Sequence, residues 1–404
     1  MKLVLSLGML FLAGFSLSAA DREAPKTPPA PNPDSQKAAD FVRDLGDVRY
    51  RVRDHAAREL QKLGRSAKPA LIQGMKSSDP EVWHRCTQLL PEVMALDLKA
   101  RVDAFLADAE GKQKHDLPMM ESFQKIVGKD APSRKLFADI VKSNAGFLES
   151  CEQNPKLAGE KYGVRAMELQ QQLWGPWSGG PRPQMNTADI ASLFLIGADP
   201  EMSKGISANN INPVSNFLWQ QPFQNALRTG EQSAPFRKLF FAWAENRSDV
   251  NSISQALSVI QNMNLKEGMD FAAKVMKMKD LQVWSRAQAM TVVGKMGGKE
   301  QLADMVALFE DKTPVTNIQW NNVAISTQIN DIALAMAVHL TSQNHKDYGF
   351  DALQTQPGLL WAYHYLGFSS DEKRTAAFKK WKDWSDDEKK KNEKKDKNEK
   401  KDKK

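Results

Sequence analysis

The chain has 404 residues, a formal net charge of +7 and 41% hydrophobic residues, a composition that suits a large folded protein. Its two cysteines are too few for a small scaffold held together by disulfides. The positive charge lies at one end, because residues 389–404 contain ten lysines and four acidic residues, while residues 21–388 sum to about zero. Nucleic-acid binding by the folded body is therefore not expected.

Residues 1–20 have the pattern of a secretory signal peptide. Lys2 supplies a positive charge, residues 3–15 are mostly apolar, and Ser18-Ala19-Ala20 offers small residues for cleavage. The apolar stretch is shorter than the ~20 residues of a membrane helix, and no later stretch is long and apolar enough. We expect an exported protein that is periplasmic, cell-surface or extracellular, with no transmembrane segment in the mature chain.

A proline-rich linker, residues 21–34, precedes a helical pattern that occurs twice at a spacing of thirty residues. The apolar positions of the two copies are Val52, Ala56, Leu60 and Leu63, and then Val82, Cys86, Leu90 and Val93. A helix pair that cannot bury its own apolar stripe stacks on a copy of itself, as in an α-solenoid. Cys86 takes the position of Ala56, so we favour free, buried cysteines over a Cys86–Cys151 disulfide.

Helical spacing of apolar residues continues along the chain, and no stretch shows sustained alternation typical of strands. Residues 174–213, rich in Trp, Gly, Pro and Asn, interrupt it as an irregular middle region between two HEAT-like helical halves, 35–173 and 214–384. Ser369 and Glu372 fit a capping box that opens a terminal capping helix. We predict an all-α protein, an α-solenoid of short HEAT-like helix pairs forming an α-α superhelix.

The C-terminal tail, residues 385–404, contains no apolar residue, so we predict that it is disordered. The lysines proposed as an electrostatic tether to anionic envelope polymers or lipid are Lys389, Lys390, Lys391, Lys394 and Lys395. The alternative, which the interspersed acidic residues favour, is a solubilising terminus.

Residues 52–79 resemble a short HEAT-type repeat. The matching residues are Val52-Arg53, Ala56-Ala57, Leu60, Leu63-Gly64 and Pro69-Ala70-Leu71. The spacing is shorter than the about 40–47 residues of the longer HEAT period and closer to short bacterial HEAT-like repeats. Further blocks resemble exported bacterial HEAT-like helical-repeat proteins of undefined function, among them 123–128, 264–268, 294–300, 333–350 and 367–374. The resemblance implies an armadillo-like helical fold and transfers no catalytic residue.

Motifs for catalysis, metal binding or cofactor binding are absent from the sequence. The six histidines do not form an H-E-x-x-H motif, and the two cysteines do not form Cys-x-x-Cys. His339, His345 and His364 could meet after folding, although scattered structural histidines are favoured. Residues 294–300 fit a turn between helices better than a phosphate loop. We predict no catalytic residue, metal or cofactor.

Trp174 and Trp177 are the candidate contacts for a partner protein or a glycan, because aromatic rings on a Gly/Pro-rich loop can stack on either. The alternative, which we favour, is that both rings pack down and hold the loop in place. The first functional hypothesis is a non-enzymatic scaffold that mediates protein–protein interaction in the cell envelope. The second is an envelope hydrolase or lyase with a site near the irregular middle region.

Overall fold

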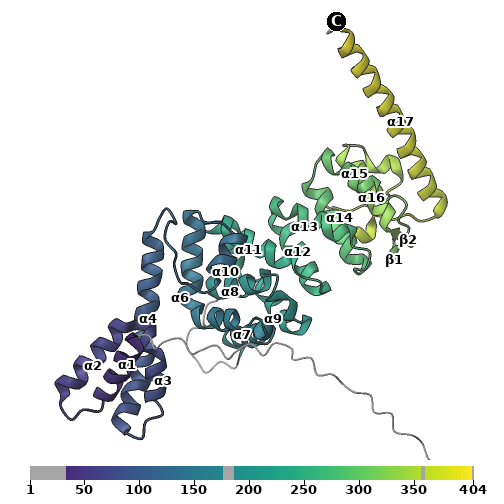
Figure 1. Cartoon of the computed structure of the whole chain (residues 1–404). Helices are drawn as coiled ribbons and strands as arrows, with labels where there is room; N and C mark the ends of the chain where they lie inside the picture. The colour runs from purple at the N-terminus through teal and green to yellow at the C-terminus, as the bar shows by residue number, and fades with distance from the viewer. Residues whose placement is uncertain (1–32, 176–185, 356–359, 403–404) are drawn as a thin grey trace, which may run out of the picture. The chain divides into compact units, whose positions relative to one another are not determined.

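The computed structural model describes residues 33–175, 186–355 and 360–402, and side chains as far as Lys391. These residues are mainly helical, and they contain one two-stranded sheet (Figure 1). The chain divides into two compact units, Met1–Leu98 and Lys99–Lys404, a division that does not coincide with the predicted middle region. The predicted signal peptide lies outside the described residues, and so do residues 21–32 of the linker.

The helices of the first unit share one core. They are α1 (Pro33–Asp44), α2 (Tyr50–Leu63), α3 (Lys68–Gly74) and the part of α4 (Pro80–Ala107) up to Leu98. Gly64 ends α2 with a φ of +57°, which glycine adopts without the steric cost of a Cβ. The following N–H, that of Arg65, donates to the Asp97 carboxylate at 3.2 Å, so the end of α2 is joined to α4.

The two copies of the predicted repeat agree at some positions and differ at others. Ala56 and Cys86 are both fully buried in this core, as the thirty-residue register predicts. The predicted equivalence of Leu60 and Leu90 is wrong, since Leu60 is fully buried but Leu90 is only partly buried. Leu89, one position earlier, is the buried leucine on α4. Along a helix as long as α4, the side that faces the core shifts from one sequence position to the next, so Leu89 is buried in place of Leu90.

The first part of the second unit is assembled around α8. Its helices are α5 (Met120–Ile126), α6 (Ala131–Gln153), α7 (Ala158–Trp174), α8 (Thr187–Ala198), α9 (Ala208–Phe217), α10 (Gln221–Arg228) and α11 (Ser233–Glu245). Helix α8 is buried on all sides and packs against α6, α7 and α11. Around Phe194 lies an aromatic cluster, completed by Phe223, Phe236, Phe240 and Trp243.

The prediction of an irregular region over residues 174–213 needs correction. Helix α8 and most of α9 fall within it, while residues 176–185 lie outside the described part. Helix α8 was missed because a helix surrounded by protein is apolar all round and has no polar face to reveal its period.

The last part of the chain forms helices and a hairpin. They are α12 (Val250–Met263), α13 (Met269–Lys277), α14 (Val283–Met296), α15 (Leu302–Val306), β1 (Pro314–Trp320), β2 (Val323–Gln328), α16 (Ile329–Leu340) and α17 (Asp371–Asp402). The antiparallel hairpin formed by β1 and β2 departs from the all-α prediction. Its turn residues Asn321 and Asn322 have φ values of 47° and 62°, as a two-residue primed turn requires. The pair Asn321-Asn322, between two segments in which polar and apolar residues alternate, was the sequence signal for this hairpin.

Short 3₁₀ helices join several of these elements. They are Gly64–Ala67, Pro155–Leu157, Ser203–Gly205, Lys266–Gly268, Lys299–Gln301, His345–Tyr348 and Tyr363–Tyr365.

Helix α17 docks through its first half and continues into the lysine-rich tail. Arg374 donates to both carboxylate oxygens of the buried Asp331, at 2.8 and 3.1 Å, and Trp381 packs against Phe309. The N-cap hydrogen bond lies one residue beyond the predicted capping box, because Ser370 Oγ accepts the N–H of Lys373, and lysine cannot return the second bond of such a box. The predicted disorder of residues 385–402 is also wrong, since their backbone is helical as far as Asp402.

The helical tail has a local cause that composition alone did not reveal. Lysine and glutamate have good intrinsic helix propensity, and opposite charges three positions apart support a helix. Two such ion pairs are formed, between Lys390 and Asp387 at 3.5 Å and between Lys391 and Glu388 at 2.9 Å. Lack of apolar residues therefore excludes a buried tail but not a helical one.

Candidate binding site

A kink in α6 provides the starting point for the site. The backbone of Asn144 is non-helical, with φ −135° and ψ 19°, and its side chain is buried. Its amide group donates to the Ala188 carbonyl of α8 at 3.3 Å and accepts from Arg165 of α7 at 3.0 Å. Asparagine side chains compete with helical backbone bonds in this way. One residue thus connects three helices.

Arg165 is held in place by two carboxylates as well as by Asn144. Its Nη2 lies 3.1 Å from Oδ1 of Asp189, at the start of α8, and its Nη1 lies 3.2 Å from Oε2 of Glu168. The Arg165 side chain is largely buried, so these contacts compensate for the hydration that the guanidinium has lost. The contacts with Asn144 and Asp189 join α7 to α6 and α8.

The other side of α7 approaches the 3₁₀ helix Ser203–Gly205 and α9 closely. A Cβ placed on Gly159 would lie 1.8 Å from the carbonyl oxygen of Gly205, and one on Gly163 would lie 2.7 Å from the Asn210 side chain. Asn210 also donates to the Gly159 carbonyl at 2.9 Å. Close packing on this side depends on the two glycines. It leaves another face of α7 for solvent.

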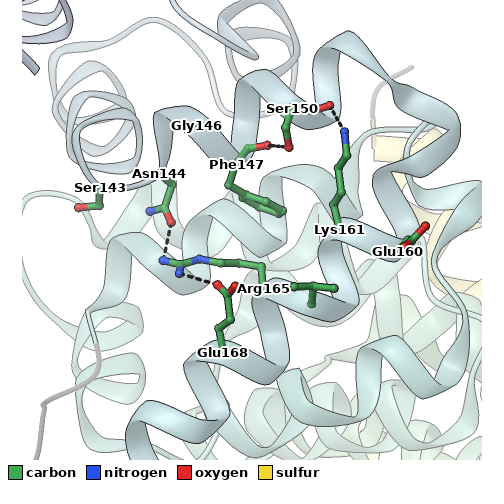
Figure 2. Close-up of a pocket in the computed structure, with 10 residues that line it drawn as sticks. Ser143, Asn144, Gly146, Phe147, Ser150, Glu160, Lys161, Arg165 and Glu168 are labelled. Carbon is green, nitrogen blue, oxygen red and sulfur yellow. Dashed lines mark hydrogen bonds and ion pairs between the residues drawn. The ribbon is translucent and has the colours of Figure 1, made fainter. Parts of the chain in front are cut away.

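A pocket of about 490 Å³ opens between α6 and α7, as Figure 2 shows. Its lining residues are Ser143, Asn144, Gly146, Phe147, Ser150, Glu160, Lys161, Val164, Arg165 and Glu168. The volume falls in the range of small-ligand sites, about 300–1,000 Å³. Its wall combines a partly buried aromatic ring, Phe147, with cations and hydrogen-bonding groups. Such a wall can hold an apolar group and orient a charged one.

Three apolar side chains of α7 are exposed, and one of them, Val164, lines this pocket. Val164, Met167 and Trp174 have exposed fractions of 48%, 52% and 42%. Their spacing of three and seven residues places them along one side of the helix. The Trp174 ring stacks on Phe217 of α9, with centroids 5.7 Å apart and an interplanar angle of 4°. Trp174 therefore packs down onto α9, as the favoured alternative describes, while part of its ring stays exposed.

The other predicted contact residues are placed only in part. Trp177 lies outside the described residues. Lys389, Lys390 and Lys391 are exposed on α17. The side chains of Lys394 and Lys395 are outside the description, although their backbone belongs to the same helix.

Two of the three C-terminal histidines meet around one tryptophan. The rings of His339 and His345 lie 5.1 and 4.3 Å from the Trp361 ring, and 6.3 Å from each other. His364 instead contacts Tyr363 and Tyr365. Burial lowers the pKa of all three histidines below its usual value. Within the described ranges, no group of three or more His, Cys, Asp or Glu side chains could hold a metal ion.

The cysteines are structural rather than reactive. Cys86 and Cys151 are both free and buried, as the sequence favoured. Burial raises the pKa of each thiol to about 11, which keeps it protonated at neutral pH.

The pocket was not predicted from the sequence. Arg165, Lys161 and Glu168 read locally as an ordinary charged helix surface, and nothing in their spacing points to Asn144 or Asp189. One weak signal existed, the sequence Asn144-Ala145-Gly146 inside an otherwise helical run, where asparagine and glycine both have low helix propensity.

Comparison with known proteins adds no further constraint on function. No family model matches the chain, and no match is found among curated proteins. None of the helices in the described ranges is long and apolar enough to cross a membrane. Functional inference therefore depends on the residues and contacts described above.

Proposed function

We propose that this chain is an exported helical-repeat scaffold that binds a protein partner in the cell envelope through the surface formed by α6 and α7. The observation that carries the proposal is the α7 surface, defined as the exposed side chains Val164, Met167 and Trp174, of which Val164 also lines the pocket. Exposed apolar side chains along one side of a helix are typical of surfaces where a protein segment docks.

Trp174 is suited to anchor such a partner. Tryptophan is enriched among the residues that contribute most to binding at protein interfaces. Stacking on Phe217 orders the ring before any partner arrives, which reduces the conformational entropy that binding would otherwise cost. A half-exposed, ordered ring is therefore better prepared for contact than a mobile one.

The solenoid and the export remain parts of the proposal. The signal-peptide pattern of residues 1–20 supports export. Residues 82–86 of α4 and 283–287 of α14 share the pattern Val-Trp-x-Arg-small, and the tryptophan and the small residue have similar burial in both, which supports a repeated unit. Cys86 and Ala287 are fully buried, whereas Trp83 and Trp284 are 48% and 36% exposed.

A site-specific photo-crosslinking experiment tests the partner surface. A photoreactive amino acid at Gln171, an exposed position between Met167 and Trp174, should form a defined crosslinked species with a partner in the native envelope. Combining it with Met167→Ser and Trp174→Ala should reduce that species strongly, because both anchors are removed.

Matched substitutions separate a loss of contact from a loss of fold. Val306→Ser removes a similarly exposed apolar residue from α15 and should leave the crosslink intact. Thermal unfolding of each variant checks the fold. If Trp174→Ala lowers stability because the contact with Phe217 is lost, the crosslinking test uses Met167→Ser alone. An undiminished crosslink in the folded double variant contradicts the proposal.

A further inference from the structure

Lys161 is a cation on the pocket wall that the fold has not matched with a carboxylate. Its ammonium group donates to the backbone carbonyl of Ser150 at 2.5 Å, which is a neutral acceptor. In the described part of the chain no carboxylate oxygen lies within ion-pair distance of Lys161. Arg165, one turn further along α7, is by contrast compensated by Asp189 and Glu168. The positive charge available in this pocket is therefore that of Lys161.

The acidic residue next to it does not neutralise this charge. Glu160 is exposed at the edge of the pocket, and Figure 2 shows its carboxylate apart from the Lys161 ammonium. Lys161 itself is only partly exposed. A partly dehydrated cation gains more from an anionic acceptor than from a neutral carbonyl, because charge-assisted hydrogen bonds are roughly twice as strong.

An apolar surface lies beside this cation. Phe147, on α6, and Val164, on α7, line the same pocket, and Figure 2 shows the Phe147 side chain between Asn144 and Lys161. The wall at Gly146 is open, since an added Cβ there would meet no atom within 4 Å. A side chain of moderate size can therefore enter between the two helices.

Arg165 contributes one further hydrogen-bond donor. Its Nε is buried and has no acceptor among the described residues, although both of its terminal nitrogens are used. A buried donor without an acceptor is costly. Lys161 and Arg165 both belong to the same helix as the exposed α7 surface.

We infer that the pocket receives a carboxylate that a partner protein carries next to an apolar side chain. The carboxylate pairs with Lys161, and the apolar side chain contacts Phe147 and Val164. The inference rests on the proposed function, because it names the chemistry of the segment that docks beside the α7 surface. The carboxylate has two sources in a protein, its C-terminus or the side chain of an acidic residue.

Binding of small probes to the full chain tests this chemistry, with ligand-observed NMR as the readout. N-acetyl-leucine represents a C-terminal carboxylate, N-acetyl-glutamate amide represents an acidic side chain, and N-acetyl-leucinamide is the uncharged control. At least one acid should bind about tenfold or more tightly than the amide, as one charge-assisted contact provides. The acid that binds more tightly shows whether the partner supplies a C-terminal or a side-chain carboxylate.

Variants assign the binding to the pocket. Lys161→Met should weaken binding of the acid to the level of the amide, and Lys161→Arg should retain the preference for the acid. Gly146→Phe should fill the pocket and abolish binding. Lys156→Met removes an exposed lysine outside the pocket and should change nothing. Thermal unfolding confirms that each variant is folded.

Equal binding of acid and amide, or an acid preference that survives Lys161→Met, overturns the inference. So does the absence of binding by both acids to the wild-type chain. If the Gln171 crosslink nevertheless depends on Met167 and Trp174, the proposed partner surface stands while its assigned chemistry fails. Conversely, acid binding without a dependent crosslink supports the pocket and contradicts the partner surface.

Discussion

Gly146 and Gly159 show how position decides the role of a glycine in this chain. Gly146 lies within α6 next to the open pocket, where an added Cβ meets no atom within 4 Å. Gly159 lies in α7, where the same atom would meet the Gly205 carbonyl oxygen at 1.8 Å. Gly146 lowers the helix propensity of α6 although the packing around it would accept a side chain. Gly159 is required, because two backbones approach each other there.

Gly146→Ala should therefore raise the free energy of unfolding by about 0.5–1 kcal/mol, the difference in helix propensity between the two residues. Gly159→Ala should lower it, by about 1–3 kcal/mol or more, because the backbone of Ser203–Gly205 must move. Urea unfolding of both variants measures the two effects. An equal loss of stability in both would show that Gly146 is also needed for packing.

The histidines around Trp361 should make stability depend on pH. Burial lowers their pKa below the ordinary value of 6.5, so the folded chain binds fewer protons than the unfolded chain near and below that pH. Their contribution is complete above pH 6.5 and is lost as the pH falls. His345 also makes a hydrogen bond between Nε2 and the Ala335 carbonyl at 2.9 Å, which a glutamine can retain.

Lowering the pH from about 7.5 to about 5.5 should therefore decrease the melting temperature of the wild-type chain more than that of His345→Gln. The free energy of unfolding should depend on pH less steeply in the variant, by at most about 1.4 kcal/mol per pH unit, which is the value for one proton. His55→Gln, at an exposed position, should behave as wild type. Parallel pH profiles for wild type and His345→Gln would exclude this role for the cluster.

Among the elements, α2 and α4 contain the two copies of the predicted repeat, and they bury different positions of it. Leu60 of α2 is fully buried, while Leu90 of α4 packs at the margin of the same core. Leu60→Ala should cost about 2–5 kcal/mol of unfolding free energy, as buried leucines do. Leu90→Ala should cost distinctly less, and Arg58→Ala, on the exposed face, less than about 0.5 kcal/mol. Denaturant unfolding ranks the three, and equal costs for the two leucines would restore the strict thirty-residue register.

Helix α17 combines a docked half and a charged half. Arg374, Ala377 and Trp381 are buried, whereas residues 389–404 include no apolar side chain. Deleting residues 389–404 should leave the melting temperature unchanged and remove a net charge of +6. Retention on anionic vesicles should then weaken, most clearly at low salt, where the Debye length is about 30 Å at 0.01 M. Equal retention of both forms would reduce the tail to a solubilising terminus.

At the scale of the whole molecule, the two compact units have separate cores. The first core contains Leu60, and the second contains the aromatic cluster around Phe194. We expect Leu60→Ala to lower the unfolding temperature of the first unit and Gly159→Ala to lower that of the second. Differential scanning calorimetry measures both, and identical changes from the two substitutions would indicate one cooperative unit.

The helical content of this chain follows from its sequence alone, for a local reason. Apolar residues that recur every three to four positions require one face to be buried, whichever partner covers it. The burial of Ala56 and Cys86 could be predicted in the same way, from their place within each stripe. Charge and composition likewise excluded a buried tail, although they did not exclude the helix that residues 385–402 form.

The site depended on contacts between distant residues, which no local pattern contains. Asn144, Arg165 and Asp189 come from three helices and meet because α6 is kinked and α8 is enclosed by its neighbours. Burial of α8 removed the polar face that would have revealed it as a helix. The pocket, with Lys161 on its wall, exists only where these three helices are packed together, because local periodicity says which face is buried but not which face it meets.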